Sequence, residues 1–561
     1  MTGTLIPQLQ DIVGRRHVHT GARGTRRFRR GYRYGDGEVL AAVEPGTLVE
    51  QWKVLEACVA ADVAIIFQAA NTGLTGGSTP FGEGYDRPIV IISTLRNRRI
   101  DLLDDGRQVL CMPGATLDQL ERRLKPMGRE PHSVIGSSCI GASVTGGVCN
   151  NSGGSLVQRG PAYTELSLFA QVDAEGRLHL VNHLGMRLGD APLAILDRLD
   201  HGRYSEADVD FPQGRQASDI EYKDHVRDIA APTPARFNAD PRRHYEASGS
   251  AGKIGVFAVR LDTFAVAQEE RVFYIGTSDP SELQTIRRHI LETFPTLPIA
   301  GEYMHADAFR AAQVWGKDLY LFIRSFGTVN VPRAFAAKSW FDGVTERLGL
   351  GKAVSDHLLQ LFSRILPEQM PKRLIAYRDM YPHHLMIRAG DTCIDTLRAY
   401  LGSIFPSATG SFLECTDAEG KAAFLNRFTV GSAVVRYRAV HKRTVDDIVA
   451  LDVALPRDTL DWFETLPEEL SRQMALKIYV GHFFCQVMHQ EYLVKKGVDC
   501  DALEHQICAL LDARGAEYPA EHNVGHLYEA KPALRDFYRS LDPTNTFNPG
   551  IGKTSKCRHW H

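Results

Sequence analysis

A glycine-rich segment, residues 136–155, has the composition of a surface laid against a phosphate-bearing cofactor. Seventeen of its twenty residues are small or polar, although the segments on both sides are apolar. Glycine lets the backbone approach another molecule closely, and backbone N–H groups in glycine turns form concave sites for anions. The segment therefore predicts one wall of a cofactor site. Its glycines are Gly136, Gly141, Gly146, Gly147, Gly153 and Gly154.

A second glycine-rich loop, residues 71–80, directly follows a short apolar run. The run, residues 63–67, contains β-branched residues and is typical of a buried strand. A glycine loop after a strand commonly holds phosphate. The loop lacks the Lys of an ATP-type phosphate loop, since none follows Gly77-Ser78, and no GxGxxG opens a helix here. The pair of loops therefore favours a large cofactor other than NAD.

Three histidines near the C-terminus are candidates for proton transfer or metal binding. His482 and His489 are seven residues apart in GHFFCQVMH. One continuous strand would place them on opposite faces, whereas a turn between them would let them converge. His522 follows Glu521 in EHNVGH, and an imidazole titrating near neutral pH can act as a base. Taken alone, a loop hydrogen bond explains His522 better, and the aromatic residues around the pair also fit two core histidines.

The elements that must position these residues alternate between helices and strands. We expect helices over residues 48–62, 115–128, 280–294, 444–455 and 504–515. We expect strands over residues 63–67, 88–94, 108–114, 253–264, 271–276, 384–390 and 436–441. Residues 201–245 are polar and contain prolines, which predicts a long surface excursion, and the tail from residue 516 should end in turns.

Length and composition indicate a globular protein of two or three domains. The chain has 561 residues, 44% of them hydrophobic and 24% charged. It contains no run of eighteen apolar residues and no hydrophobic core of a signal peptide. Its ten cysteines form no CxxC pair, which favours reduced thiols in a cytosolic setting.

Basic residues are concentrated in two regions, although the formal net charge is only −2. Residues 306–380 contain eleven Lys or Arg against seven Asp or Glu, and residues 419–442 contain five against one. Aromatic and apolar residues interleave with these charges over residues 315–341. Basic runs are usually solvated faces, but this mixture suits docking on an anionic bilayer. We expect no nucleic-acid partner, because the chain as a whole is not basic and contains no nucleic-acid-binding motif.

Several longer blocks resemble the quinone-dependent D-lactate dehydrogenases, flavoproteins that share the FAD-binding fold of vanillyl-alcohol oxidase. The resemblance runs from about residue 30 to near the C-terminus. The blocks are AANTGLTGGSTP, PHSVIGSSCIGASVTGGVCNNSGGS, RDMYPHHL, YVGHFF, HQEYLVKKGVD, EYPAEHNVGHLYEA and DPTNTFNPGIGKTSK.

The resemblance implies an α+β protein: a two-lobed vanillyl-alcohol-oxidase-type FAD-binding domain, an α+β cap domain and a basic membrane-docking insertion. The implied FAD-binding domain covers residues 1–264, with a C-terminal return over 516–561. The implied cap, which also forms the substrate domain, comprises residues 265–305, 381–418 and 443–515. The membrane-binding segment comprises residues 306–380 and 419–442.

The cofactor implied by the resemblance is FAD. We expect noncovalent binding, because neither His17 nor His132 lies in the sequence context used by members that attach flavin through histidine. The implied contacts come from the first loop, the second wall and a backbone group near the adenine. They are Ala69, Ala70, Asn71, Thr72, Gly73, Gly77, Ser78, Gly136, Ser143, Gly153 and Val256.

The implied active site centres on EHNVGH, which is similar to the family's Glu-His-Gly-x-Gly turn. Asn523 replaces a glycine, and Asn tolerates positive φ better than most residues. His522 would be the base and Glu521 its partner. Related metal-dependent enzymes carry HxxxxxxH with this Glu, which makes His482, His489 and Glu521 a candidate site for zinc or a similar divalent ion. Such enzymes also place a carboxylate-binding Arg and a Lys fifteen residues apart, a spacing that Arg373 and Arg388 share.

These observations predict a peripheral respiratory enzyme on the cytoplasmic face of the bacterial inner membrane. It would oxidise D-lactate by hydride transfer to FAD and pass electrons to membrane quinone, with no role for NAD. One alternative is a soluble FAD-dependent 2-hydroxyacid dehydrogenase or oxidase with a different acceptor. Another is a nonenzymatic lipid-binding protein on a degenerate flavin scaffold, against which the intact glycine loops and EH turn argue.

Overall fold

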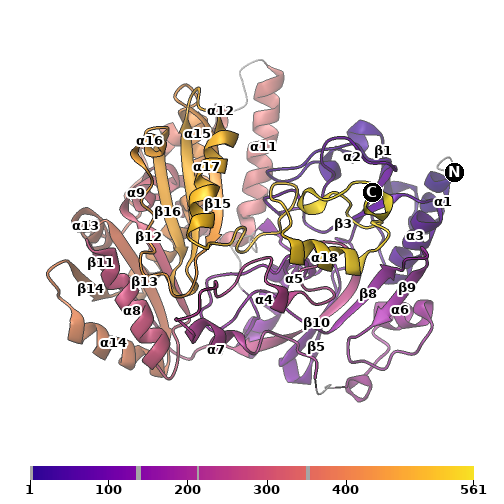
Figure 1. Ribbon diagram of the computed structural model, residues 1–561, viewed down its shortest axis with the longest axis horizontal. Helices are drawn as coiled ribbons and strands as arrows, with labels where there is room; N and C mark the ends of the chain where they lie inside the picture. The colour runs from indigo at the N-terminus through magenta and orange to yellow at the C-terminus, as the bar shows by residue number, and fades with distance from the viewer. Residues whose placement is uncertain (1–3, 134–139, 211–213, 349–353) are drawn as a thin grey trace.

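Two halves, each built on its own sheets, make up the molecule (Figure 1). The computed structural model describes residues 4–133, 140–210, 214–348 and 354–561. The N-terminal half contains the chain to residue 265 and the tail from residue 523, and the cap half contains most of the residues between them, including Glu521, whose backbone N–H donates to Asp452. Both chain ends lie in the N-terminal half, so the chain crosses to the cap half and returns.

The first sheet of the N-terminal half has four strands in the order β1-β2-β4-β3. β2, β4 and β3 run parallel, and their Ala, Val and Ile residues are buried, as parallel strands require. The strands are β1 Val18–Thr20, β2 Ala41–Val43, β3 Ala64–Gln68 and β4 Ile89–Ser93.

The second sheet of this half is organised around β10, which pairs with β6, β7 and β8. Its strands are β5 Ile100–Leu103, β6 Gln108–Cys111, β7 Arg129–Pro131, β8 Ser167–Val172, β9 Leu178–Asn182 and β10 Gly255–Ala265. The helices of this half are α1 Leu5–Val13, α2 Gly21–Arg29, α3 Leu48–Ala60, α4 Leu117–Leu124, α5 Val144–Cys149, α6 Pro192–His201, α7 Tyr222–Arg227 and α18 Pro532–Leu541. α4 starts at a capping box in which Thr116 and Gln119 bond each other's backbone, which fixes where the helix begins.

The cap half is built on one antiparallel sheet of seven strands in the order β14-β11-β13-β12-β16-β17-β15. The strands are β11 Glu270–Thr277, β12 Ala300–His305, β13 His383–Gly390, β14 Gly410–Glu414, β15 Val445–Ala454, β16 Met474–His482 and β17 Val487–Lys495. One face packs against α8 Pro280–Thr293, α14 Thr392–Ile404 and α17 Cys500–Ala513. The other face packs against α9 Ala306–Trp315 and α15 Asp417–Val440.

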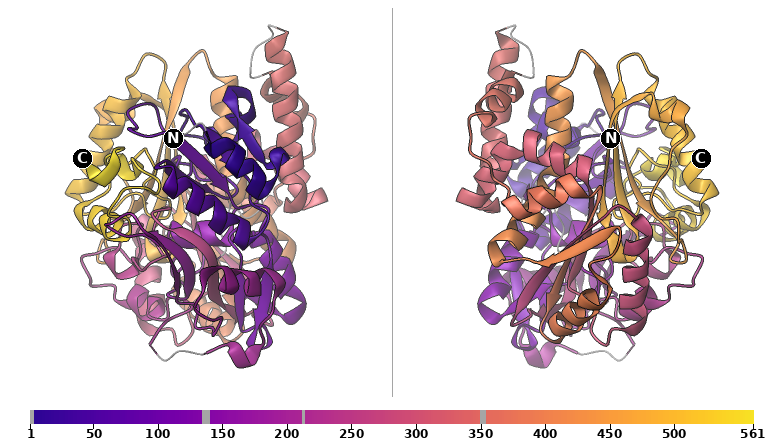
Figure 2. Two further views of the ribbon diagram at one scale, coloured as in Figure 1. Left: turned by 90° about the vertical axis from the view of Figure 1, so that its right-hand side faces the viewer. Right: turned by 90° about the vertical axis from the view of Figure 1, so that its left-hand side faces the viewer.

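The basic region between β12 and β13 is helical. After α9, it contains α10 Lys317–Phe326, α11 Val331–Arg347, α12 Val354–Ser363 and α13 Lys372–Met380. The short helix α16, Glu468–Ser471, lies outside this region, between β15 and β16. Figure 2 shows α11 at one edge of the molecule in both views. None of the helices formed by the described residues is long and apolar enough to cross a bilayer.

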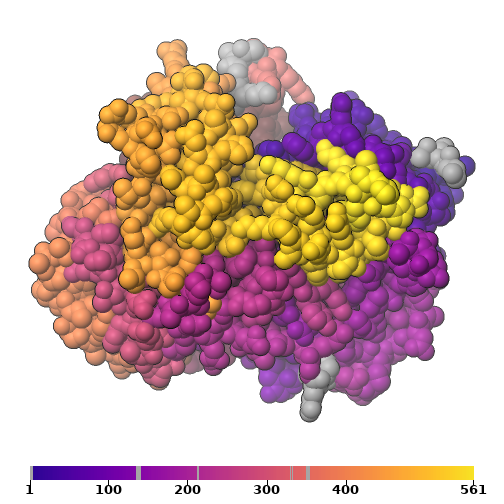
Figure 3. All heavy atoms as spheres, viewed as in Figure 1, coloured from indigo at the N-terminus to yellow at the C-terminus, as the bar shows by residue number. Residues whose placement is uncertain are grey.

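The C-terminal tail closes the N-terminal half. The backbone N–H of Asn548 donates to the carbonyl of Ile65 at 2.8 Å, which attaches the tail to β3. The buried ammonium of Lys253 donates to Asn545 Oδ1 at 2.7 Å and to the Phe547 carbonyl at 2.9 Å. Figure 3 shows this segment in yellow over the N-terminal half, beside the cap half.

Most of the expected elements are confirmed, and two expectations are wrong. Residues 444–455, expected as a helix, form β15, and residues 436–441, expected as a strand, form the end of α15. The buried side chains near the end of β15 belong to a sheet core, which outweighs the local helical pattern of its acidic residues. The tail from residue 516 ends in turns as expected, and these turns follow α18.

Residues 201–245 have little regular structure, but they are not a simple surface excursion. Tyr222, Val226 and Ala235 belong to the largest core cluster. Arg236 is 2% exposed and reaches the other half of the molecule. The proline and polar content of the segment predicted its irregular path correctly. Its burial was not predicted, because it depends on tertiary contacts that no local pattern reveals.

Candidate active site

The first glycine loop folds back on itself beside an open space. Asn71 has φ +52°, its amide donates to the Arg30 carbonyl at 2.7 Å, and Ser78 Oγ donates to its side-chain oxygen at 3.1 Å. A Cβ built on Gly73 would meet no described atom within 4 Å, so the loop can approach another molecule there. Ala69, Ala70 and Thr72 are half-buried along the same loop. This geometry fits a phosphate cradle.

The second glycine wall meets the cap half. A Cβ on Gly153 would lie 2.7 Å from Glu521 Oε1 and 3.0 Å from Arg236 Cζ, so only glycine fits at this contact. Ser143 caps α5 by accepting from the Gly146 N–H at 3.0 Å. Gly136 lies outside the described residues. Val256 is on β10, and its carbonyl already accepts from Gln51 Nε2 at 3.2 Å.

Polar residues form a row across four neighbouring strands of the cap sheet. Glu302 on β12 pairs in register with His482 at the end of β16. Asp452 on β15 pairs in register with His489 on β17. A turn at residues 483–485 joins β16 to β17 and brings the two imidazole rings to 5.0 Å between centroids. Of the two arrangements that the sequence left open, the structure has the turn, and the two histidines converge.

Buried carboxylates hold one nitrogen of each histidine in the pair. Glu302 Oε1 lies 2.8 Å from His482 Nδ1, and Asp452 Oδ1 lies 3.3 Å from His489 Nδ1. The two Nε2 atoms face Glu521 Oε2, at 3.3 Å from His482 and 3.9 Å from His489. One ligand atom from each of His482, His489 and Glu521 lies within 4.8 Å of the others. Two imidazole nitrogens and a carboxylate oxygen are suitable donors for zinc, and outer carboxylates fix such ligands.

The EH turn joins this row through Asp452. His522 Nδ1 lies 2.8 Å from Asp452 Oδ2, and the backbone N–H of Glu521 donates to the same oxygen at 2.7 Å. Asp452 is 5% exposed, so one buried carboxylate orients His489, His522 and the backbone of the EH turn. On its other side Glu521 pairs with Arg236. His522 Nε2 is left as the nitrogen available to a substrate.

Asn523 is tolerated in the EH turn for a different reason from the expected one. It does not have a positive φ, whereas Gly525 has φ +56°. The side-chain oxygen of Asn523 accepts from the Gly525 N–H at 2.8 Å, and its amide donates to Asn150 Oδ1 at 2.6 Å. Thr75 Oγ1 donates to the Asn523 carbonyl at 2.8 Å. The residue thus ties the turn to both glycine segments.

Burial and neighbouring charges act in opposite directions on the pKa values of the residues in the site. Burial alone would lower the pKa of His482, but Glu302 and Glu521 outweigh it and raise that pKa to about 10. Burial also opposes the charged form of His522, and Asp452 outweighs it, so the pKa of His522 is raised. Burial disfavours ionised Glu521, but His482 and Arg236 hold its pKa well below the usual range. The carboxylates therefore favour the charged forms of His482 and His522 against the effect of burial.

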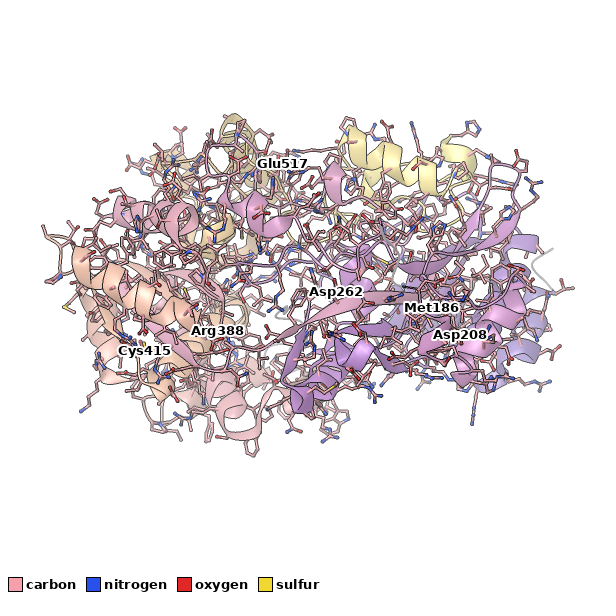
Figure 4. All side chains as sticks on the ribbon, turned by 90° about the horizontal axis from the view of Figure 1, so that it is seen from below. Met186, Asp208, Asp262, Arg388, Cys415 and Glu517 are labelled. Atoms are coloured by element: carbon pink, nitrogen blue, oxygen red, sulfur yellow. The ribbon has the colours of Figure 1, made fainter. Side chains whose placement is uncertain are left out.

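The two arginines suggested for a substrate carboxylate lie in different places. Arg373, on α13, is more than half exposed and pairs with Glu419 at 3.2 Å, so no described contact brings it to the histidine row. Arg388, on β13, is opposite Ala300 in the register, two residues along β12 from Glu302. Its Nε is buried without a described partner, and its guanidinium lies 5.5 Å from the Phe424 ring. Figure 4 shows Arg388 on the same side of the molecule as Cys415, with Asp262 between it and Met186.

Four residues of the cluster were not singled out in the sequence. They are Glu302, Asp452, Arg236 and Arg427, the last of which pairs with Glu302 at 3.0 Å. Recognising residues 445–454 as a strand would have shown that Asp452 lies on a sheet face. No local signal marks the other three, because their partners are distant in the chain.

Two family models match the sequence. One, described as "D-lactate dehydrogenase, membrane binding", matches residues 272–560, and one described as "FAD binding domain" matches residues 39–182. The chain is 54% identical over 558 residues to the quinone-dependent D-lactate dehydrogenase of Haemophilus influenzae, covering 99% of both chains. It is 53% identical to the enzyme of the same name from Escherichia coli, covering 99% of this chain and 97% of that one.

Solved structures with the same fold are more distant in sequence. p-Cresol methylhydroxylase with bound substrate matches with a TM-score of 0.61 at 12% identity, covering 99% of this chain and 97% of that chain. 4-Ethylphenol oxidase from Gulosibacter chungangensis matches with a TM-score of 0.57 at 12% identity, covering 98% and 97%. These matches support the expected α+β fold of the vanillyl-alcohol-oxidase type.

Proposed function

The chain belongs to the family of quinone-dependent D-lactate dehydrogenases, and from this premise we propose how its residues carry out the reaction. The protein is an FAD-dependent oxidoreductase that oxidises D-lactate to pyruvate and passes the electrons to quinone. The observation that carries the proposed roles is the row of buried carboxylates, which holds the Nδ1 atom of His482, His489 and His522. The Nε2 atoms of His482 and His489 then face Glu521.

FAD is held by the two glycine segments of the N-terminal half. The open space at Gly73 and the bonded loop from Asn71 to Ser78 fit close approach of a phosphate group. Bound FAD supplies the acceptor for the hydride that leaves C2 of lactate. Noncovalent attachment predicts that denaturing the protein releases all of its flavin into solution. We propose that NAD has no part, since no dinucleotide-binding motif was found.

His522 is the base in this proposal. Oxidation of a 2-hydroxy acid removes a proton from the hydroxyl as well as hydride from C2, and His522 Nε2 accepts that proton. Asp452, at 2.8 Å from Nδ1, fixes the tautomer and stabilises the imidazolium that forms. Glu521 contributes negative charge beside the ring and is itself held by Arg236.

His482, His489 and Glu521 would hold a divalent ion such as zinc. Their donor atoms already converge, and both histidines present Nε2 because carboxylates hold Nδ1. A bound ion would polarise the substrate oxygen and lower the pKa of the hydroxyl. Arg388 is the better of the two arginine candidates for the substrate carboxylate, since its buried Nε has no described partner. Arg373 remains a prediction that the geometry does not favour.

Replacing His522 with Ala tests the base. The variant should keep its FAD, and flavin reduction by D-lactate should slow by roughly 10²–10⁴-fold, the range for a positioned base. Stopped-flow absorbance near 450 nm measures that step before any quinone reacts. His179→Ala, at an exposed site, is the matched control. Reduction at near the wild-type rate in His522→Ala would remove this residue from the mechanism.

Elemental analysis and chelation test the metal. We expect about one divalent ion per chain in the wild-type protein, flavin reduction that slows after chelation, and recovery when the metal is added back. His489→Ala should lose the ion while keeping FAD. A metal-free enzyme that is insensitive to chelators would contradict the metal site and leave protonated His482 as the local positive charge.

We propose that membrane contact is made by α10 to α12, on the cytoplasmic face of the bacterial inner membrane. Their exposed large apolar side chains include Phe326, Trp340, Phe341, Leu358, Leu361 and Phe362. Fewer charges are free than the sequence suggested, because Lys338 is 3.0 Å from both Asp342 and Asp356 and holds α11 to α12. Exposed Arg324 and Arg333 remain for anionic headgroups.

Vesicle sedimentation tests this contact. Arg324→Glu with Arg333→Glu should weaken binding to anionic vesicles at low salt by at least about fivefold, from roughly 1 kcal/mol per basic residue. Trp340→Ala with Phe362→Ala should remove the salt-resistant part. Arg177→Glu, in an exposed part of the N-terminal half, is the control. Unchanged binding in both double variants would exclude these helices as the docking surface.

A further inference from the structure

Helix α15 connects the active site to the membrane-binding helices. Near its middle, Arg427 Nε lies 3.0 Å from Glu302 Oε2, in the row that holds His482. Further along, Arg436 Nε lies 2.7 Å from Asp356 Oδ1 of α12, and its Nη2 lies 3.0 Å from Asp318 of α10. The two arginines are nine residues apart, which is about 13.5 Å along a helix. One rigid element therefore spans from the site to the membrane helices.

Between these two anchors, α15 exposes an apolar stripe. Phe428 is 38% exposed and Val435 is 57% exposed, and a seven-residue spacing puts them on one side of the helix. Gly431 lies between them and is exposed, and a Cβ there would be 3.9 Å from Glu491 Oε1 of β17. Phe424 precedes them, half-buried beside the Arg388 guanidinium. We call Phe424, Phe428, Gly431 and Val435 the α15 stripe.

The stripe runs along α15 from the turn anchored at the site to the turn anchored at the membrane-binding helices. Val435 precedes Arg436, which is anchored to α10 and α12, and these helices carry exposed Phe326 and Phe362. Phe428 follows Arg427, which is anchored to Glu302. Single exposed apolar residues need no explanation, but a row joining these two places does. A lipid headgroup has no reason to reach a cluster of histidines, whereas the electron acceptor of this family must approach the flavin.

We propose that the α15 stripe is the docking track for the quinone ring. This inference rests on the proposed function, in which the N-terminal half holds FAD and the cap half holds the substrate-oxidising residues. A quinone has a flat, largely apolar ring on a lipid-soluble tail. Phe424 and Phe428 offer aromatic faces, and Gly431 leaves room for a ring to lie against the helix. The tail remains with the membrane helices beyond Val435.

Polar substitutions on the stripe test the track. Phe428→Asp and Val435→Asp change exposed positions, so the fold should be kept. Each should raise the KM for a short-chain, water-soluble quinone by roughly tenfold or more, since burying such a side chain contributes about 1.5–3 kcal/mol. Reduction of the flavin by D-lactate and turnover with a soluble dye should stay within about twofold. Leu460→Asp, exposed and outside the stripe, is the matched control.

A binding measurement complements these rates. An azido-quinone should label the tryptic peptide 428–436, FTVGSAVVR, after illumination, and unlabelled quinone should suppress the label. Labelling only of peptides outside residues 422–436 would overturn the proposal, as would unchanged quinone kinetics in both variants. Loss of vesicle binding with normal short-chain quinone kinetics would assign the stripe to lipid instead. Failure of the wild-type protein to reduce its flavin with D-lactate would contradict the proposed function, not the stripe.

Discussion

The two halves of the molecule recognise their ligands by opposite means. In the N-terminal half, the cofactor loops rely on the backbone: Gly73 leaves an open space, and Asn71 and Ser78 bond each other within one short loop. In the cap half, recognition relies on charged side chains, since Glu302, Asp452 and Glu521 meet from distant parts of the chain. The cofactor loops are formed by residues close together in the sequence, whereas the charged cluster exists only after the cap sheet has formed.

This difference separates binding from chemistry. A backbone cradle tolerates change in most side chains but fails where a Cβ is added at a contact. A network of buried charges keeps its shape after a conservative change but loses its electrostatic balance. Substitutions in the two halves should therefore fail in different ways, and the following experiments separate them.

The largest effect is expected at the contact between the halves. Gly153→Val adds atoms where a Cβ alone would lie 2.7 Å from Glu521 Oε1, so it should displace both the glycine wall and the Glu521–Arg236 pair. We expect nearly colourless protein and a loss of D-lactate oxidation of at least about 10³-fold. Flavin absorbance and turnover measure this.

The control for this prediction is Gly402→Val on α14, where a Cβ would meet no described atom within 4 Å. It should retain its flavin and its activity. Full FAD content in Gly153→Val would show that FAD binding does not depend on the contact between Gly153 and the Glu521–Arg236 pair.

A smaller effect is expected from Asp452→Asn, which tests the cap half alone. An amide has one acceptor oxygen, but the native carboxylate serves His489, His522 and the Glu521 N–H. FAD content should be normal, and flavin reduction should slow by roughly 10–100-fold, as for other outer partners of ligating histidines. Asp446→Asn, exposed on the same strand, is the control.

The pH dependence of Asp452→Asn gives a second readout. His522 must be neutral to accept a proton, and Asp452 raises its pKa against the effect of burial. Without that charge the pKa falls, so the acid limb of the rate profile should move to lower pH even as the maximum rate drops. An acid limb that stays in place would mean that Asp452 does not control His522.

The smallest effect concerns the stability of the cap half, not its chemistry. His384 on β13 is fully buried between Tyr274 and Phe309, and burial lowers its pKa to about 3. The unfolded chain takes up that proton below about pH 6.5, so stability falls as the pH drops from 6.5 toward 3. His384→Phe should remove this term, about 3 kcal/mol at pH 4.5. Acid unfolding monitored by circular dichroism would show a lower midpoint, and an unchanged midpoint would contradict the prediction.

What the sequence reveals follows the same division. The glycine loops, the strand before residue 71 and the choice of His482 and His489 as candidate ligands depend on short-range patterns, and these were predicted. The strand β15 was mistaken for a helix, because its acidic residues suggested a solvated face while its sheet partners lay far away in the chain. Arg236 and Glu302 could not be predicted at all, since only tertiary packing brings them to Glu521 and His482.

Arg236 has a consequence for the exchange of modules between related enzymes. It comes from the irregular segment before β10, yet its guanidinium holds Glu521, which follows the last helix of the cap half. A chimaera that took its cap from a relative with another substrate preference would leave Arg236 behind with the host. The residues that must be exchanged together therefore do not match the structural boundary between the two halves. A chimaera that keeps its activity would have to take residues 232–240 from the same parent as the cap sheet, although these residues lie outside the cap in the sequence.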